Sequence, residues 1–266
     1  MNSETSSNNV SDVSDLNNIA NGNLQAQILG LTDSHIHYFA QNAQFPETKV
    51  GIHQQVLPAF QALVAKGKDV GITIEIASGF RSFERQLLIW NNKYTGKTAV
   101  KNIDGETLAL AELSSLEIIQ SILLFSALPG ASRHHWGCDI DIYAPNLLPK
   151  EQSLQLEPWE YEPTGPMAIL TEFLAKEAQP LGFYFPYDNY RGGVAAEPWH
   201  LSYAPLANKY QQAFDMSTLK QCLNETDIKG KNIIINELTN IVKQFVLNIN
   251  PNNLSTATPA TGATRG

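Results

Sequence analysis

The sequence predicts an α+β fold, a single domain whose central, mostly antiparallel sheet is flanked by helices. Segments with helical spacing of apolar residues are interspersed with short alternating segments, without a regular strand–helix–strand rhythm. Hydrophobic residues make up 43% of the 266-residue chain and charged residues 17%, an ordinary soluble composition with ample material for a core. No long linker rich in Pro, Gly and Ser interrupts residues 24–250, so we expect one domain there.

The two ends of the chain differ from this central part. Residues 1–23 are rich in Asn, Ser and Asp, and residues 251–266 in Ser, Thr, Ala, Pro and Gly, so we expect a disordered leader and a disordered tail. The first residues contain neither the basic start nor the apolar stretch of a secretory signal. Either the protein stays in the cytoplasm or a signal is missing from this sequence.

Charge and hydropathy argue against two classes of partner. The net charge of −8 leaves no basic stripe for a nucleic acid. No apolar run approaches the roughly 18 residues of a membrane-spanning helix. Cys138 and Cys222 lie far apart in the sequence, which does not indicate a disulfide framework.

The first half of the domain is expected to form helices around one strand. Apolar residues recur at helical spacing over 56–64, and Gly67 is expected to end that helix. Residues 71–77 alternate like a half-buried strand. Ser82 is a candidate N-cap for the next helix. A further apolar stripe predicts a helix over about 107–127.

Residues 138–143 alternate between apolar and polar side chains. We therefore expect a strand with an apolar face on the core and a polar face lining a cleft, with Asp139 and Asp141 on the polar face. We expect a proline-rich loop over 144–166, a helix over 167–178 and a strand over 182–185. A turn at 191–193 and two or three short closing helices over 207–248 complete the domain.

Two short segments carry most of the residues that could bind a metal. Residues 132–141 hold two of the six histidines and two aspartates, and residues 197–200 add a glutamate and a histidine. Two imidazoles and one carboxylate hold a zinc ion and leave a fourth position for water, and an unligated carboxylate can take the proton of that water. The sequence therefore predicts a zinc peptidase with Zn²⁺ as cofactor.

The spacing within each segment is informative. His134 and Asp141 are seven residues apart, which suits a loop-to-strand corner. Glu197 and His200 are three apart, which on a regular strand places them on opposite faces. Both can face one ion only if the chain bends between them, and Pro198 is expected to force that bend.

Neighbouring residues offer alternatives to these ligands. His135 could replace His134, and Asp139 lies on the same strand face as Asp141. Spacing leaves both alternatives open.

Three motifs stand in order along the chain: Ser78-Gly79-Phe80-Arg81-Ser82, Ser132-x-His134-x2-Gly137-x3-Asp141 and Glu197-x-Trp199-His200. Over about residues 50–205 this set resembles the zinc D-alanyl-D-alanine carboxypeptidases. That family includes the vancomycin-resistance carboxypeptidases and related bacterial LD-carboxypeptidases. The resemblance implies an α+β fold of the kind shared with the hedgehog signalling domain.

The resemblance also implies roles for individual residues. Zinc would be held by His134, Asp141 and His200, with Glu197 as the general base that takes the proton of the attacking water.

On the substrate side, Arg81 would bind the peptide or stabilise the oxyanion, and Gln86 and Ser132 would be polar contacts to the peptide. The implied substrate is a peptidoglycan stem peptide or muropeptide, cleaved before its C-terminal D-alanine at a D,D or L,D bond. The family implies the periplasm or cell envelope as location.

Asp139 departs from the family pattern, which usually has a small residue, often alanine, at this position. We expect Asp139 to orient a ligand imidazole or to hold a nearby cation, with a solvated cleft carboxylate as the alternative. Its extra negative charge would strengthen metal binding and disfavour an anionic substrate terminus nearby.

Two other functions compete with this hypothesis. The segment Asp33-Ser34-His35-Ile36-His37 resembles the first metal motif of amidohydrolase barrels, but a (β/α)8 barrel typically needs about 250 ordered residues and no βα rhythm follows. The other alternative is a catalytically silent zinc-binding or peptidoglycan-binding module on the same fold. The presence of Glu197 and Arg81 beside three ligands favours an enzyme.

Overall fold

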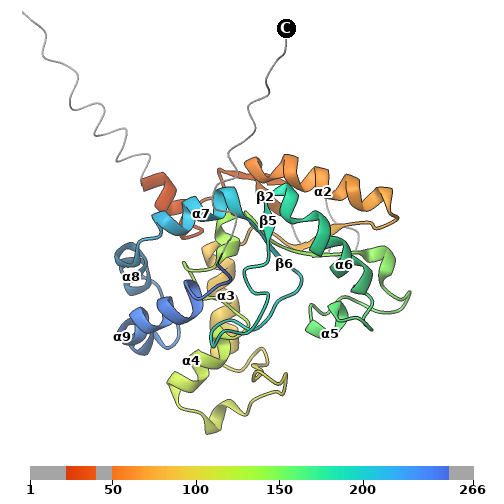
Figure 1. Ribbon diagram of the computed structural model, residues 1–266. Helices are drawn as coiled ribbons and strands as arrows, with labels where there is room; N and C mark the ends of the chain where they lie inside the picture. Colours follow the sequence, from red (N-terminus) through yellow and green to blue (C-terminus); the bar gives the residue numbers. More distant parts are fainter. Residues whose placement is uncertain (1–21, 40–49, 252–266) are drawn as a thin grey trace, which may run out of the picture.

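A four-stranded antiparallel sheet lies at the centre of the computed structural model, which describes residues 22–39 and 50–251 (Figure 1). Its strands lie side by side in the order β3 (Glu75–Ser78), β4 (Asp139–Tyr143), β6 (His200–Tyr203) and β5 (Phe183–Tyr184). A second, two-stranded antiparallel sheet pairs β1 (Ile36–Tyr38) with β2 (Gly51–His53). The expected single-domain α+β fold with antiparallel sheets is confirmed.

The helices form two groups around the larger sheet. The main ones are α2 (Leu57–Asp69), α3 (Phe83–Tyr94), α4 (Ser115–Leu123), α5 (Pro158–Tyr161), α6 (Ala168–Glu177), α7 (Ala204–Ala213), α8 (Met216–Glu225) and α9 (Lys231–Ile241). In Figure 1, α2 and α6 lie together on one side of the sheet, and α3, α4, α8 and α9 form a separate group.

Each group of helices has its own hydrophobic core. Ile140 and Ile142 of β4 pack with Leu201 of β6 in the core that α2 and α6 share. The other core lies among α3, α4, α8 and α9, with Trp90 fully buried in it. The polar face of β4 points away from its apolar core, as the alternation predicts, but all five residues of β4 are buried. Asp141 on that face lines a pocket, as expected, whereas Asp139 is fully enclosed.

Local signals set several helix boundaries. The Ser82 hydroxyl accepts a hydrogen bond from the backbone N–H of Arg85 at 3.2 Å, which confirms the predicted N-cap of α3. Gly67, expected to end the preceding helix, lies buried inside α2 instead. A side chain is excluded at this position, because a Cβ there would lie 2.8 Å from Ile74 Cδ1. The chain leaves α2 at Asp69.

The predicted helix over 107–127 is too long. Ser114 and Glu117 form a capping box that begins α4 only at Ser115, and the helix ends at Leu123. The predicted loop 144–166 contains the short helix α5. The closing region 207–248 forms α8, α9 and most of α7, and then a π-helical turn, Val242–Val246.

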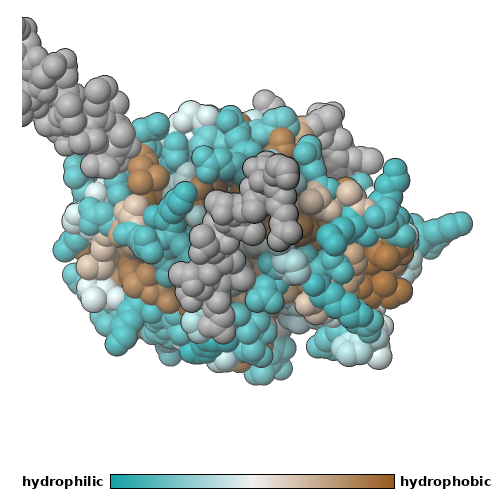
Figure 2. All heavy atoms as spheres, turned by 45° about the horizontal axis from the view of Figure 1, so that its top comes forward, coloured by the Kyte–Doolittle hydropathy of each residue, from teal (hydrophilic) through white to brown (hydrophobic). Residues whose placement is uncertain are grey.

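The expected leader and tail fall mostly outside the described residues, although residues 22 and 23 belong to a helix at 22–28. None of the helices in the described part of the chain is both long and apolar enough to span a membrane. The face in Figure 2 carries mainly hydrophilic side chains, with hydrophobic ones in separate groups between them.

Candidate metal centre

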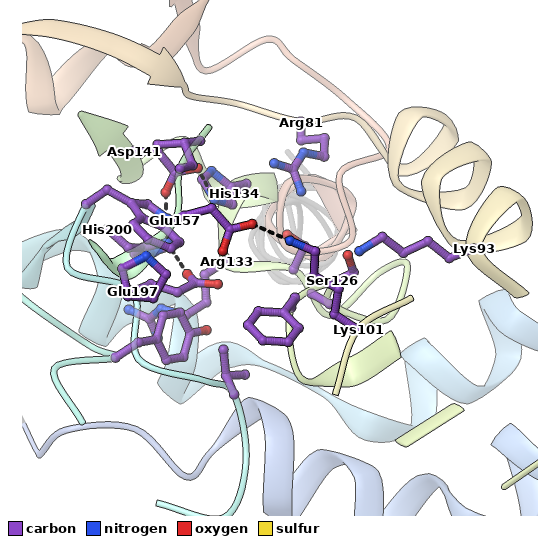
Figure 3. A pocket seen from close by; sticks show the side chains of 18 of the residues that line it. Arg81, Lys93, Lys101, Ser126, Arg133, His134, Asp141, Glu157, Glu197 and His200 are labelled. Atoms are coloured by element: carbon purple, nitrogen blue, oxygen red, sulfur yellow. Dashed lines mark hydrogen bonds and ion pairs between the residues drawn. The ribbon is translucent and has the colours of Figure 1, made fainter. Parts of the chain in front are cut away.

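His134, Asp141 and His200 meet at one point, although 66 positions separate the first from the last. Their ligand atoms all lie within 4.8 Å of one another, and all three residues are buried (Figure 3). Asp141 stands directly opposite His200 in the β4–β6 register, and cross-strand partners project from the same face of a sheet. His134 reaches this face from the short helix Arg133–Trp136, which precedes β4.

Each imidazole has one ring nitrogen held by a neighbour, which turns the other toward the cluster. His134 Nδ1 lies 2.9 Å from the carbonyl oxygen of Gly79, and His200 Nε2 lies 3.0 Å from Asp139 Oδ2. His134 Nε2 then faces Asp141 Oδ2 at 3.4 Å, and His200 Nδ1 faces Asp141 Oδ1 at 3.1 Å. Metal-binding histidines have this arrangement, with the outer nitrogen donating to an oxygen.

The residues present fit a metal ion. Asp141 Oδ1 and His200 Nδ1 are buried and face each other, yet neither has a hydrogen bond of acceptable geometry. Buried polar atoms rarely lack a partner, and a cation between them would satisfy both. In the parts of the chain that the structure describes, this is the only group of three His, Cys, Asp or Glu side chains close enough for a metal.

Burial and charge set the protonation of this group. Burial lowers the pKa of His134 to about 4, so its imidazole is neutral. Burial also acts to lower the pKa of His200, but the surrounding carboxylates outweigh it and raise that pKa well above its ordinary value. Burial acts to raise the pKa of Asp141, but the two imidazoles hold it below its usual range. Asp141 is therefore ionised beside the neutral imidazole of His134, and this pair of donors favours a cation.

Glu197 lies beside this group. Its Oε2 is 3.2 Å from His200 Nδ1, and burial raises its pKa. The backbone N–H of His200 donates to the carbonyl of Glu197 at 3.1 Å, which closes a turn at Pro198 and Trp199. This is the bend that the sequence requires if Glu197 and His200 are to face one ion.

Asp139 is fully buried and ion-paired rather than solvated. Its carboxylate accepts from Arg133 Nε at 2.5 Å and from Ser202 Oγ at 2.8 Å, in addition to its contact with His200. Burial acts to raise the pKa of Asp139, but Arg133 holds it well below the usual range. Asp139 therefore lies beside the His200 imidazole, as one of the two expectations had it, and is not a solvated cleft carboxylate. Because Arg133 compensates its charge, the expected electrostatic penalty for an anionic substrate does not follow.

Arg81 lies at the edge of the same pocket. Its guanidinium donates from Nη1 to Gln86 Oε1 at 2.9 Å and from Nη2 to Ser78 Oγ at 3.0 Å. Both partners are neutral, so the positive charge is available to a ligand. Gln86 is fully buried behind Arg81 and donates to the carbonyl of Ala127 at 2.7 Å. It does not line the pocket, and its contact is with Arg81.

Ser132 lines the pocket, and its buried hydroxyl has no hydrogen-bond partner within the described residues. His135 is not available as a ligand, because Nδ1 lies 2.6 Å from the Arg81 carbonyl and Nε2 accepts from the Gly130 N–H at 3.0 Å. Geometry thus selects His134 over His135, a choice that spacing left open.

The amidohydrolase alternative is wrong. The fold has small antiparallel sheets instead of a (β/α)8 barrel. His37 is exposed on β1 and packs against Phe39, with ring centroids 5.4 Å apart. His35 is buried among aromatic rings, 5.3 Å from the ring of His53.

The sequence analysis did not assign two residues of the metal centre, Ser202 and Arg133. Ser202 follows His200 by two positions, so strand alternation alone would have placed it on the same face. Arg133 gives no such signal, because its burial depends on Asp139, Ser202 and Tyr184, which it meets only in the folded protein.

The fold and the metal-binding side chains together indicate a class of protein. Two imidazoles and a carboxylate with a glutamate beside them, in a pocket of about 340 Å³, form a centre of the kind found in hydrolases that use a single metal. The family model of VanY, D-alanyl-D-alanine carboxypeptidase, matches residues 49–206. The chain therefore belongs to the VanY D-alanyl-D-alanine carboxypeptidase family, and the resemblance seen in the motifs is confirmed.

The chain is also similar to individual proteins. A protein of Haemophilus influenzae described as uncharacterised is 44% identical over 119 residues, which span 44% of this chain and 91% of that protein. Among solved structures, VanYB in complex with D-Alanine-D-Alanine is 23% identical, covers 72% of this chain and 90% of its own, and has a TM-score of 0.45. The LdcB LD-carboxypeptidase is 19% identical, covers 79% and 78%, and has a TM-score of 0.45.

Proposed function

We propose that this protein is a zinc-dependent carboxypeptidase that removes the C-terminal D-alanine from peptidoglycan stem peptides. The observation that carries the proposal is the convergence of His134 Nε2, Asp141 and His200 Nδ1, with buried polar atoms that lack other partners. Membership of the VanY family supports the substrate class. The proposal covers both the D,D and the L,D bond.

These three side chains would hold the zinc ion. When bound, zinc supplies a Lewis acid that makes water acidic enough to react near neutral pH. Glu197 accepts the proton of the attacking water and returns it to the leaving amine, and its burial suits this role because its pKa is raised toward the working pH. Arg81 offers N–H donors to the terminal carboxylate or to the developing oxyanion. Ser132 can donate its unpaired hydroxyl to the peptide.

Gln86 is assigned a positioning role. It fixes the Arg81 guanidinium through a 2.9 Å hydrogen bond, and it would therefore act on the peptide through Arg81.

One experiment tests the proposal. The purified protein is analysed for zinc and incubated with stem peptides of defined length, with and without a chelator, and the released amino acid and the remaining peptide are identified. We expect zinc-dependent release of D-alanine, and the products distinguish the D,D from the L,D bond.

The variant Glu197→Gln is expected to retain zinc and to lose about 10²- to 10⁴-fold in turnover, the contribution of a general base. Loss of zinc in this variant would contradict its role as the unligated base. Binding of zinc and peptide by the wild-type protein without hydrolysis would instead identify a silent binding module.

A further inference from the structure

The pocket continues beyond the metal-binding residues to a second, basic end. There it is lined by Thr98, Ala99 and Lys101, and by Lys93 in the last turn of α3. Figure 3 shows Arg81 between this end and the cluster that contains Asp141. Its volume of about 340 Å³ is in the range of pockets that bind ligands larger than one residue, about 300 to 1,000 Å³. A single terminal alanine would leave much of it empty.

Two lysines line this end, and they differ in their partners. Lys101 forms an ion pair of 2.6 Å with Glu157, which neutralises it. The Lys93 ammonium, in contrast, forms no hydrogen bond or ion pair with any residue that the structure describes, although its side chain is half-buried and lines the pocket. A partly desolvated ammonium without an ion-pair partner is stabilised when an anion binds beside it.

The wall opposite Lys93 is built so that Glu157 meets Lys101. Glu160 is fully buried and accepts the backbone N–H groups of Gln155 at 3.1 Å and Glu157 at 3.0 Å. Leu156 between them has φ +54°, the only positive φ among the described residues other than glycine. Such a conformation persists only where its surroundings fix it. The backbone that carries Glu157 is therefore held in place, with Glu157 paired to Lys101 rather than to Lys93.

The distance along α3 relates Lys93 to the bond that would be cut. Helix α3 begins at Phe83, two residues after Arg81, and rises about 15 Å along its axis from Phe83 to Lys93. An extended peptide advances about 3.3 to 3.6 Å per residue, and the two long basic side chains reach inward and shorten the gap. The Lys93 ammonium thus lies within a few residues of a peptide bond held at the metal centre.

Building on the carboxypeptidase activity proposed above, with Arg81 at the oxyanion rather than at the terminal carboxylate, we propose that Lys93 binds a carboxylate carried by a residue on the acyl side of the scissile bond. Lys93 would then select stem peptides that carry a side-chain carboxylate near their end over peptides in which that group is neutral. Lys93 touches no reacting atom in this arrangement, so its role is to determine specificity.

Two pentapeptides test this inference. Both end in D-Ala-D-Ala, and the third residue of each is a diamino diacid whose side-chain carboxylate is free in one and amidated in the other. For the zinc-loaded full chain we expect kcat/KM to be about tenfold higher for the free acid, the effect of one charge-assisted hydrogen bond reduced by solvent exposure. In Lys93→Met this ratio should fall to near one, and Lys93→Arg should retain most of it.

The matched control is Lys220→Met, which removes an exposed lysine of α8 outside the pocket and should leave the ratio unchanged. A wild-type ratio near one would overturn the inference. An equal loss for both peptides in Lys93→Met would also overturn it, because Lys93 would then contact a group that both peptides share.

A binding measurement separates this inference from the proposed function. Zinc-loaded Glu197→Gln protein is titrated with each peptide by calorimetry, which needs no turnover. Tighter binding of the free acid that Lys93→Met abolishes supports the Lys93 site even if neither peptide is hydrolysed. Absence of hydrolysis by the wild-type protein would refute only the carboxypeptidase proposal.

Discussion

Replacing Asp139 by alanine should weaken zinc binding without touching a ligand. In the folded protein the Asp139 carboxylate accepts from His200 Nε2 at 3.0 Å and pairs with Arg133 at 2.5 Å. The substitution therefore removes two interactions at once. It frees the outer nitrogen of a ligand imidazole, and it leaves a buried guanidinium without its counter-charge.

The two losses have different magnitudes. Outer-shell partners of metal-binding histidines contribute about 10- to 100-fold to metal affinity, or about 1.4 to 2.7 kcal/mol. Breaking a buried ion pair costs about 3 to 5 kcal/mol of folding stability. Arg133 keeps hydrogen bonds to Tyr184 at 3.0 Å and Ser202 at 2.8 Å, so we expect the lower end, about 3 kcal/mol.

A double variant separates these effects. Arg133→Met/Asp139→Ala removes both charges, so it should regain part of the stability that Asp139→Ala loses. It should not regain zinc affinity, because His200 Nε2 still lacks its acceptor. The coupling between the two substitutions, expected at about 2 kcal/mol, is measured by a double-mutant cycle.

Stability is measured by urea unfolding in the presence of chelator, because bound zinc would add its own stabilisation. Zinc affinity is measured by competition with a chromophoric chelator. The control Ser202→Ala removes another partner of Asp139, leaves the contact with His200, and should change zinc affinity by less than about threefold. Wild-type zinc affinity in Asp139→Ala, or its recovery in the double variant, would show that Asp139 only neutralises Arg133.

Two further predictions concern stability. Gly79→Ala should cost about 3 kcal/mol of folding stability, because the new Cβ would lie 2.2 Å from the Gly51 carbonyl oxygen. It should also weaken zinc binding, because the shift would displace the Gly79 carbonyl that orients His134. Urea unfolding tests the stability loss, with Gly22→Ala as the control, since a Cβ at Gly22 has no atom within 4 Å. Asp215→Ala should cost about 1 kcal/mol near neutral pH, since Asp215 caps α8. Hydrogen bonds from Ser217 lower the pKa of Asp215 to about 2. The stabilisation by Asp215 is therefore fully present above pH ~4 and is lost as the pH falls through about 2. Urea unfolding of wild type and variant should then give the same stability at the lowest pH.

Local chemistry made part of this protein predictable. The cap at Ser82 and the alternation of Asp139 and Asp141 depend on residues within one or two turns of each other, and both are observed. The bend at Pro198 follows from the same kind of argument, because two side chains three apart on a strand cannot share a face.

Other features depend on contacts between distant segments. Gly67 looked like a helix end because glycine often follows a last turn, but the packing of Ile74 against α2 decides its place. Gln86 resembles a substrate contact in sequence, yet it reaches Ala127, 41 positions away, and is buried behind Arg81. The pairing of Arg133 with Asp139 could not be read from the sequence because the strand that buries it, β6, begins 67 residues later.

Strand register explains why so few residues suffice to build the metal centre. Asp141 pairs with His200, so Asp139 pairs with Ser202, and all four side chains share one face. A slip by one residue would turn Asp141 to the opposite face and leave His200 alone. Gly137 helps to fix this register, because its φ of +69° ends the helix that carries His134, and a Cβ there would lie 2.9 Å from the His53 nitrogen. The turn at Pro198 fixes the other strand, so the centre depends on two bends as much as on its ligands.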